Sequence, residues 1–271
     1  MKILVFIVIL LVPILFLYFS QHRLIYYPRS YASTVDLPGI ERLLFTTGQG
    51  KQTAFYRAPA DEQGAAPERI WMLFGGNASL ALDWYDFVRH YPDRRAAFLL
   101  IEYPGYGNSA GRASARTILE ATIAAAETLA EHLGMEQAAM EKRLSLAGHS
   151  LGAAAALQYS VTIPVQRVVL ISPFTSLRDM AALVVGKPLN RLVRDRYDNR
   201  ARLKELAAKN PRVSVTIFHG DQDEVIPVKM GRELAAMIDG KQNYYEIAGC
   251  DHNRILSIAE EQIHRSMASG W

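Results

Sequence analysis

From residue 40 onward, short apolar runs alternate with longer segments in which apolar side chains recur at helical spacing. The apolar runs predict strands near residues 40–47, 52–58, 70–74, 97–102, 144–148, 167–171, 214–219 and 243–247. Two of these runs, 98–101 and 168–171, are apolar throughout, which is typical of parallel strands covered on both faces. The pattern therefore predicts an α/β fold with a mostly parallel central sheet and helices on both of its faces.

The clearest helical patterns span residues 115–133 and 230–238, and a glycine closely follows each of them. We expect a last helix over residues 253–266. The first two strands should form an antiparallel hairpin, because the Gly-Gln-Gly sequence at residues 48–50 is a turn signal. With 271 residues and no internal repeat, this part of the pattern fits one globular domain.

The first twenty residues follow a different pattern. The run Ile3 to Phe19 contains no charge and one proline, and its length of about 17 residues is near the lower limit for a membrane-spanning helix. A cleaved signal peptide would end in small residues, but Tyr18 stands where one of these is needed. We therefore expect an uncleaved membrane anchor over residues 1–21, followed by an α/β domain over residues 22–271.

The flanks of this run carry cations on both sides, so they define its orientation poorly. We expect the amino terminus inside and the domain on the non-cytoplasmic side, as a single-pass membrane protein. Aromatic and basic side chains just after the run suit a membrane interface, although packing within the domain explains them equally well. These residues are Arg23, Tyr26, Tyr27, Arg29 and Tyr31.

Charge and cysteine content exclude several classes of function. The formal charge is +3 with both signs interspersed, which gives no indication of nucleic-acid binding. Cys250 is the single cysteine, so no intrachain disulfide can form, and we expect it to be a small loop residue. The chain has no Cys-x-x-Cys or His-Glu-x-x-His motif, and we expect neither a metal nor another cofactor.

The strongest chemical signal lies where the strand 144–147 ends. The next five residues read Gly-His-Ser-Leu-Gly (148–152), and an alanine-rich helical segment follows them. A Gly-x-Ser-x-Gly motif between a strand and a helix is typical of a nucleophile elbow, in which a strained turn exposes the serine. Glycines are needed on both sides because side chains there would collide with the neighbouring strand and helix. We therefore predict Ser150 as a nucleophile.

A serine hydroxyl needs a base and a group that orients the base, and after such an elbow these follow in the order acid, then histidine. The loop after the strand 213–218 offers Asp223, our prediction, and Asp221, which would otherwise cap a turn or the next helix. The loop after the last strand offers His252, and Asp251 beside it is expected to cap the last helix. Five other histidines lack this placement: His22 lies by the anchor, His90, His132 and His264 lie on helices with an expected solvated face, and His149 fills the elbow.

The loop after the strand 70–74 reads Gly-Gly-Asn-Ala (75–78). The N–H of Asn77, together with the N–H of Leu151, would form an oxyanion hole. The alternative is a tight turn without a catalytic role.

These residues resemble those of the Bem46-like, serine aminopeptidase S33-type branch of the α/β hydrolases, which is related to animal abhydrolase-domain proteins that sit on membranes. The similarity covers nearly the whole chain, in segments 24–28, 74–78, 103–111, 148–152, 172–176, 195–199 and 220–227. The resemblance implies an α/β-hydrolase fold, with Ser150, Asp223 and His252 as a triad and Asn77 and Leu151 as oxyanion donors. One position departs from the family: Gly75 replaces the histidine of a usual His-Gly-Asn sequence.

The expected function is hydrolysis of small acyl esters or thioesters, including lipid-like ones, through an acyl-enzyme at a membrane surface. The alternatives are a membrane-tethered peptidase of the same fold and a catalytically silent binding protein. Residues 105–110 also satisfy the dinucleotide-binding pattern Gly-x-Gly-x-x-Ala, but they follow a later strand than the first one. Residues 184–197 interleave cations with apolar side chains, which predicts either a short amphipathic helix facing the bilayer or a solvated loop.

Overall fold

The computed structural model describes residues 12, 15–16, 18–33, 35–61, 66–238 and 243–269. An eight-stranded sheet has the order β1-β2-β4-β3-β5-β6-β7-β8. Its strands are β1 (Glu41–Thr47), β2 (Gly50–Arg57), β3 (Arg69–Phe74), β4 (Ala96–Ile101), β5 (Leu144–His149), β6 (Arg167–Ile171), β7 (Ser214–Gly220) and β8 (Tyr244–Ile247). Strand β2 pairs antiparallel with β1 and with β4. The six strands that follow β2 in the sheet, β4-β3-β5-β6-β7-β8, are parallel. The predicted mostly parallel sheet and its initial hairpin are confirmed.

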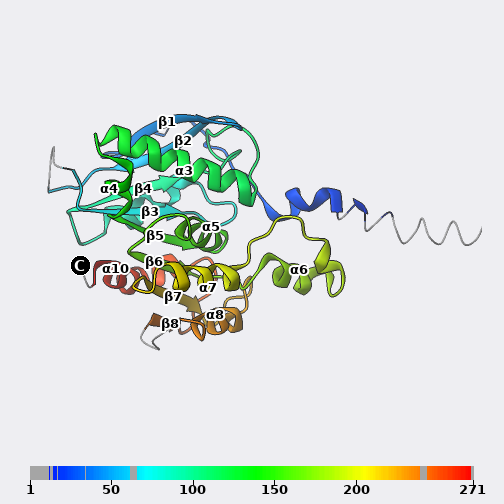
Figure 1. Ribbon diagram of the computed structural model, residues 1–271. Helices are drawn as coiled ribbons and strands as arrows, with labels where there is room; N and C mark the ends of the chain where they lie inside the picture. Colours follow the sequence, from blue (N-terminus) through cyan, green and yellow to red (C-terminus); the bar gives the residue numbers. More distant parts are fainter. Residues whose placement is uncertain are drawn as a thin grey trace, which may run out of the picture.

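Helices cover both faces of the sheet (Figure 1). The α-helices are α2 (Tyr85–Arg89), α3 (Ala115–His132), α4 (Gln137–Glu141), α5 (Leu151–Ser160), α6 (Leu177–Val185), α7 (Asn199–Lys209), α8 (Val228–Ala235), α9 (Ile255–Ile258) and α10 (Glu260–Ala268). There are also two 3-10 helices, η1 (Ala81–Trp84) and η2 (Leu189–Leu192), and a helical stretch at residues 18–25. The expected single helix over 253–266 is wrong, because Ala259 leaves the helical conformation at φ −100° and ψ 11° and separates α9 from α10.

The core explains why the central strands are apolar throughout. In β3, Ile70 and Met72 pack against the helices of one face, including α3 and α5, while Trp71 packs against the helices of the other face, including α2 and α10. Successive side chains of a strand point to opposite faces, so a strand covered on both sides needs apolar residues at every position.

Side-chain caps define the start of three helices. The Oγ of Ser114 accepts from the N–H of Thr117 at the start of α3, and Asp198 accepts from the N–H of Ala201 at the start of α7. Ser176 caps α6 in the same way. Each cap satisfies an N–H that has no acceptor within its own helix.

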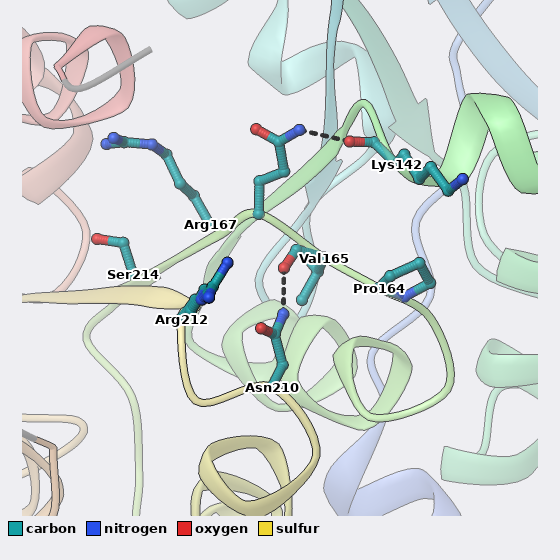
Figure 2. Close-up of a pocket in the computed structure, with 8 residues that line it drawn as sticks. Lys142, Pro164, Val165, Arg167, Asn210, Arg212 and Ser214 are labelled. Atoms are coloured by element: carbon teal, nitrogen blue, oxygen red, sulfur yellow. Dashed lines mark hydrogen bonds between the residues drawn. The ribbon is translucent and has the colours of Figure 1, made fainter.

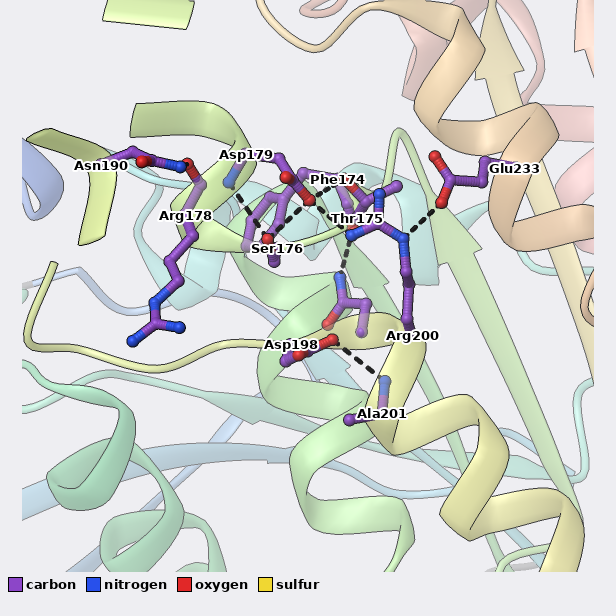
Figure 3. A network of polar contacts seen from close by, with 11 residues as sticks. Phe174, Thr175, Ser176, Arg178, Asp179, Asn190, Asp198, Arg200, Ala201 and Glu233 are labelled. Carbon is purple, nitrogen blue, oxygen red and sulfur yellow. Dashed lines mark hydrogen bonds and ion pairs between the residues drawn. The ribbon is translucent and has the colours of Figure 1, made fainter. Parts of the chain in front are cut away.

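The segment between Ser176 and Asp198 leaves the sheet and returns to it. Ser176 and Asp198 form an isolated bridge, so the intervening residues 177–197 form a closed excursion, here called the cap. A network of polar contacts holds its base (Figure 3). Asp179 accepts from the hydroxyls of Thr175 and Ser176 and pairs with Arg200 of α7 at 2.5 Å. The same Arg200 pairs with Glu233 of α8.

Residues 184–197, for which the sequence left a short amphipathic helix and a solvated loop open, form no continuous amphipathic helix. Val185 belongs to the end of α6, and Gly186 stops that helix with a φ of 71°. Only Leu189–Leu192 are helical in the remainder, as the 3-10 helix η2. The apolar side chains of this stretch are therefore divided between two short elements.

Most of the predicted anchor, namely residues 1–11, 13, 14 and 17, lies outside the described residues. Within the part that the structure describes, every helix falls short of the length and apolar character needed to cross a membrane. Residues 18–25 are helical, so this helix continues beyond the expected boundary at residue 21. The side chain of Gln21 donates to the carbonyl of Leu192 and accepts from the N–H of Arg194, both at 2.8 Å, which docks the helix on the cap.

Candidate active site

Ser150 occupies the sharp turn between β5 and α5. Its backbone has φ 56° and ψ −115°, a conformation that a residue with a side chain rarely adopts. The N–H of Ser150 donates to the carbonyl of Ile171 in the neighbouring strand at 2.8 Å, which holds the turn in place. A Cβ at Gly148 would lie 2.2 Å from the carbonyl oxygen of Gly152, and a Cβ at Gly152 would lie 2.1 Å from that of Phe74. Both glycines are therefore required by backbone contacts, as the motif predicts.

Asp223 and His252 meet beside this turn. Nδ1–H of His252 donates to Oδ2 of Asp223 at 2.7 Å, and both residues are buried. The other carboxylate oxygen accepts from the N–H groups of Val225 at 3.0 Å and Ile226 at 2.7 Å. Burial alone would raise the pKa of Asp223, but the hydrogen bonds that it accepts, first those of His219 and His252, outweigh burial and hold this pKa well below its ordinary value. The charged carboxylate fixes the proton of His252 on Nδ1, which leaves Nε2 as a base.

The alternative acid does not reach His252. Asp221 is exposed, and its Oδ1 accepts from the N–H of Gly249 at 2.7 Å, so it ties two loops together. Asp251 accepts from the N–H groups of Asn253 and Arg254 in the turn before α9. Of the neighbouring carboxylates considered from the sequence, Asp223 is the one that the structure places against His252.

His149 does more than fill the elbow. Its ring centroid lies 4.8 Å from that of His252, and its Nε2–H donates to the carbonyl of His252 at 3.1 Å. A Cβ at Gly76 would lie 2.9 Å from Nδ1 of His149, so the glycine of the Asn77 loop leaves room for this ring. Burial, followed by the nearby His252, lowers the pKa of His149 to about 3, which keeps the ring neutral. His149 therefore joins the three loops that carry Ser150, His252 and Asn77.

The Ser150 hydroxyl and the His252 ring lie at the same edge of the sheet, but among the described residues no hydrogen bond joins them. Catalytic hydrogen bonds of this kind are often long before substrate binds and tighten in the complex. His252 packs against His149, which directly precedes Ser150 in the chain, so the His252 ring lies beside the serine turn.

His219 is a residue that the sequence analysis missed. Its Nε2–H donates to the carbonyl of Ile226 at 2.8 Å and lies 3.3 Å from Oδ2 of Asp223, and the side chain is fully buried. Its Nδ1 has no partner among the described residues and faces Gly231, where a Cβ would lie 2.4 Å away. Nε2 is therefore the ring nitrogen that donates, because it is the one with acceptors within reach. One signal was available: His219 continues the face of Val215 and Ile217, so a polar ring stands on an apolar strand face beside the acid loop.

The side chain of Asn77 fixes the loop that was expected to bind an oxyanion. Its Nδ2 donates to the carbonyl of Ile25 at 2.7 Å, and its Oδ1 accepts from the N–H of Tyr27 at 3.0 Å and the hydroxyl of Tyr106 at 2.9 Å. The segment that follows the amino-terminal helix is thus tied to this loop. Leu151 is the first residue of α5, where N–H groups have no acceptor within the helix. Where a histidine usually stands, the carbonyl of Gly75 accepts from the hydroxyl of Tyr103 at 2.7 Å.

His264 was expected on a solvated face, which is wrong: it is buried, with its ring 4.2 Å from Phe87 and 5.2 Å from Tyr91. Cys250 is a buried loop residue. Residues 105–110 close a tight loop, in which Gly105 N–H donates to the carbonyls of Ser109 and Ala110. No helix begins there, since α3 starts at Ala115, so this loop lacks the helix amino terminus that binds a dinucleotide phosphate.

A cavity of about 420 Å³ lies at the opposite edge of the sheet, next to the starts of β6 and β7 (Figure 2). Its polar groups hold the loops together: the amide of Gln166 donates to the carbonyl of Lys142, and that of Asn210 donates to the carbonyl of Val165 at 2.6 Å. The side chains of Lys142 and Arg167 point in opposite directions, so they do not converge on one ligand. This cavity contains none of the predicted site residues.

Comparison with known proteins places these features in a family. A model described as the alpha/beta hydrolase family matches residues 71–238. The uncharacterized protein Rv2307c of Mycobacterium tuberculosis is 30% identical over 245 residues, which cover 89% of this chain and 83% of that protein. The uncharacterized protein YfhR of Salmonella typhi is 26% identical over 203 residues, which cover 70% of this chain and 66% of that protein.

Solved structures show the same fold at low sequence identity. The esterase Pf2001 of Pyrococcus furiosus superposes with a TM-score of 0.65 at 15% identity, covering 90% of this chain and 95% of that one. The esterase RhEst1 from Rhodococcus sp. gives a TM-score of 0.59 at 15% identity, covering 85% and 99%. Because the family model spans more than half of the chain and a 30% identical relative spans most of it, this protein belongs to the alpha/beta hydrolase family.

Proposed function

We propose that this protein is a serine hydrolase that cleaves acyl esters or thioesters, with Ser150 as nucleophile, His252 as base and Asp223 as the orienting acid. The observation that carries the proposal is the 2.7 Å hydrogen bond between buried Asp223 and His252, beside a serine in a strained turn. Such turns persist only where the surrounding structure enforces them, and they concentrate at functional sites. Two of the structurally similar proteins are esterases by name, which agrees with this reaction class.

In the proposed reaction, Nε2 of His252 takes the proton of the Ser150 hydroxyl while Oγ attacks the carbonyl carbon of the ester. The resulting imidazolium is stabilised by the charged carboxylate of Asp223. When the tetrahedral intermediate collapses, the alcohol or thiol leaves with the proton from His252, and an acyl-Ser150 remains. A water molecule then gives its proton to His252, attacks the acyl carbon, and releases the carboxylic acid and free Ser150.

The negative charge of the tetrahedral intermediate requires donors that are already in place. We assign this role to the backbone N–H groups of Leu151 and Asn77. The support for Leu151 is its position in the first turn of α5, and the support for Asn77 is the set of hydrogen bonds that fixes its side chain and hence its loop. Gly75 leaves this arrangement intact because the proposed donors are backbone groups.

We further propose that the chain belongs to the Bem46-like branch of the family and that residues 3–19 anchor it in a membrane. The motif segments of the sequence support the first statement, and the uncharged apolar run supports the second. A membrane position favours lipophilic esters among the possible acyl substrates, because such substrates concentrate in the bilayer.

Ser150→Ala tests the proposed function. We expect the full chain in detergent to hydrolyse short-chain p-nitrophenyl esters, and the variant to lose at least about 10³-fold in kcat, because no other group replaces the attacking oxygen. The matched control is Ser172→Ala, which removes the hydroxyl of another buried serine with a positive φ of 46° from the end of the adjacent strand. An active Ser150→Ala variant would refute the assignment. A folded parent that hydrolyses no ester, thioester or aminoacyl amide would favour a silent binding protein.

A further inference from the structure

The exposed apolar side chains of the molecule concentrate at one end. Of the fourteen exposed large apolar residues in the described part of the chain, nine lie in residues 12–27 or 183–192. Val184 at the end of α6 is 85% exposed and Leu183 beside it is 51% exposed, while Phe19 of the amino-terminal helix is 73% exposed. An apolar surface of this kind on a soluble domain indicates a contact site for a partner or a membrane.

The cap and the amino-terminal helix form one surface. Both project from the same end of the molecule (Figure 1). Gln21 makes its two hydrogen bonds to the backbone of the cap, and the guanidinium of Arg194 lies 5.3 Å from the ring centre of Tyr18. Within the cap, the amide of Asn190 donates to the carbonyl of Arg178, which joins η2 to α6. The exposed apolar groups of the helix and of α6 therefore belong to connected elements.

This surface is positively charged. The cap contains two acids, and both are engaged: Asp179 pairs with Arg200, and Asp195 accepts from the hydroxyl of Tyr26 and from the N–H of Ala115. Its five cations are Arg178, Lys187, Arg191, Arg194 and Arg196. The side chain of Arg178 points away from the polar network at the base of the cap (Figure 3). An apolar tip surrounded by cations is complementary to an anionic membrane surface.

A cavity of about 620 Å³ extends this basic surface at the end of the amino-terminal helix. Its lining includes His22, Arg23, Arg29 and Arg112, together with Ala78 of the loop next to the proposed oxyanion donor. The three arginine side chains suit phosphate groups, because one guanidinium can donate two N–H groups to one phosphate. The cavity therefore lies where a lipid headgroup would meet the domain.

From this geometry we propose that α6 inserts Leu183 and Val184 into the interface of an anionic lipid bilayer, beside the amino-terminal helix. The apolar run Ile3 to Phe19 leads directly into that helix, and the helix is docked on the cap through Gln21. A bilayer that holds the run is therefore the partner that we propose for the exposed tip of α6. Because α6 follows β6, the strand next to β5, insertion presents the edge that carries Ser150 to the membrane. This inference rests on the proposed function and adds that the acyl substrate enters from the lipid.

Site-specific quenching tests the insertion. The full chain with Val184→Cys, labelled with the fluorophore NBD, is reconstituted in vesicles of phosphatidylcholine and phosphatidylglycerol; the native Cys250 is buried. We expect a blue shift and at least about twofold quenching by lipids brominated on their acyl chains, since a residue of an interfacial apolar face lies at that depth. The matched control is Leu44→Cys on β1, an apolar side chain that is 69% exposed and should remain unquenched.

Hydrolysis provides a second readout. Replacing Leu183 and Val184 together by serine should lower hydrolysis of a long-chain ester in the same vesicles about tenfold, because two apolar side chains no longer leave water. Hydrolysis of soluble p-nitrophenyl acetate should not change, and Ile123→Ser on α3 should affect neither substrate.

Three outcomes would overturn the inference and leave the proposed function intact: a Val184 probe that lipid does not quench, equal quenching at Leu44, or a spectral shift that follows protein concentration instead of lipid. The last would show that a second copy of the chain covers α6. A parent protein that does not hydrolyse p-nitrophenyl acetate would instead contradict the proposed function.

Discussion

At Asp223, both carboxylate oxygens accept hydrogen bonds and the side chain is buried, whereas the side chains of Leu183 and Val184 near the end of α6 are exposed to solvent. The first arrangement is closed: Asp223, His252, His219 and His149 determine one another's positions through buried contacts. The second is open, since nothing in the described residues covers the tip of α6. Substitutions in the closed region should therefore change the rate of the chemical step on every ester. Substitutions in the open region should change hydrolysis of esters held in a bilayer and leave hydrolysis of soluble esters unchanged.

The largest expected effect separates two carboxylates of the same loop. Asp223→Asn should lower kcat about 10³- to 10⁴-fold, because an amide presents its NH₂ group to Nδ1 of His252 and disfavours the required tautomer. Asp221→Asn should change kcat less than about threefold, since the amide oxygen of asparagine can still accept the hydrogen bond from Gly249 N–H. Steady-state kinetics on a soluble ester measure both. The reverse order of effects would show that the acid is Asp221.

A smaller effect is expected at His219, which we propose as a positioning residue for Asp223. His219→Phe keeps the ring volume but removes the Nε2–H. It should lower kcat about tenfold with little change in KM, because a tenfold loss corresponds to one hydrogen bond to a charged group. His219→Gln, which can donate from a similar place, should restore part of the rate. His264→Phe is the matched control, because His264 is also buried but lies among Phe87 and Tyr91. Equal losses in the two phenylalanine variants would indicate general destabilisation.

The smallest expected effect concerns stability at the end of β4, where Tyr31 is tied to the sheet through Glu102. Its hydroxyl donates to buried Glu102 at 2.5 Å, and Ala81 N–H donates to the same carboxyl at 3.2 Å. Burial raises the pKa of Glu102 to about 7, above the unfolded value of about 4.3. The folded state therefore binds more protons than the unfolded state between these values, and this contribution to stability is present at low pH and is lost as pH rises toward 7.

Glu102→Gln removes this titration. The melting temperature of the parent relative to the variant should fall by a few degrees between about pH 5 and pH 8, on the order of 2 kcal/mol in the free energy of unfolding. Thermal unfolding at matched ionic strength measures the difference. A constant or rising difference over this range would contradict the buried, protonated carboxyl.

The same contrast explains how far sequence reasoning reached. Continuous apolar strands predicted the parallel sheet, and the glycines around Ser150 predicted its elbow, because each depends on local sterics and on burial by both helix layers. The sequence favoured Asp223 over Asp221 from their places in the loop after a strand, and the structure adds the contacts that distinguish them: Asp223 bonds to His252, and Asp221 bonds to Gly249.

What the sequence did not reveal depends on contacts between distant segments. His219 and His149 look like ordinary strand and turn residues until their partners at Ile226 and His252 are known. The burial of His264 comes from Phe87, which is far away along the chain. The docking of Gln21 on Leu192 likewise joins residues whose local sequences give no sign of each other.

The most direct test of the central claim is the site of covalent capture by a fluorophosphonate, mapped by mass spectrometry on the full chain. A fluorophosphonate reacts with a serine only when a neighbouring base activates it, so we expect a single adduct on Ser150, which forms at least about 10²-fold more slowly in Asp223→Asn. Asp221→Asn should label at the parental rate. An adduct on any other residue, or labelling of Ser150 that is indifferent to Asp223, would contradict the proposed Ser150–His252–Asp223 mechanism.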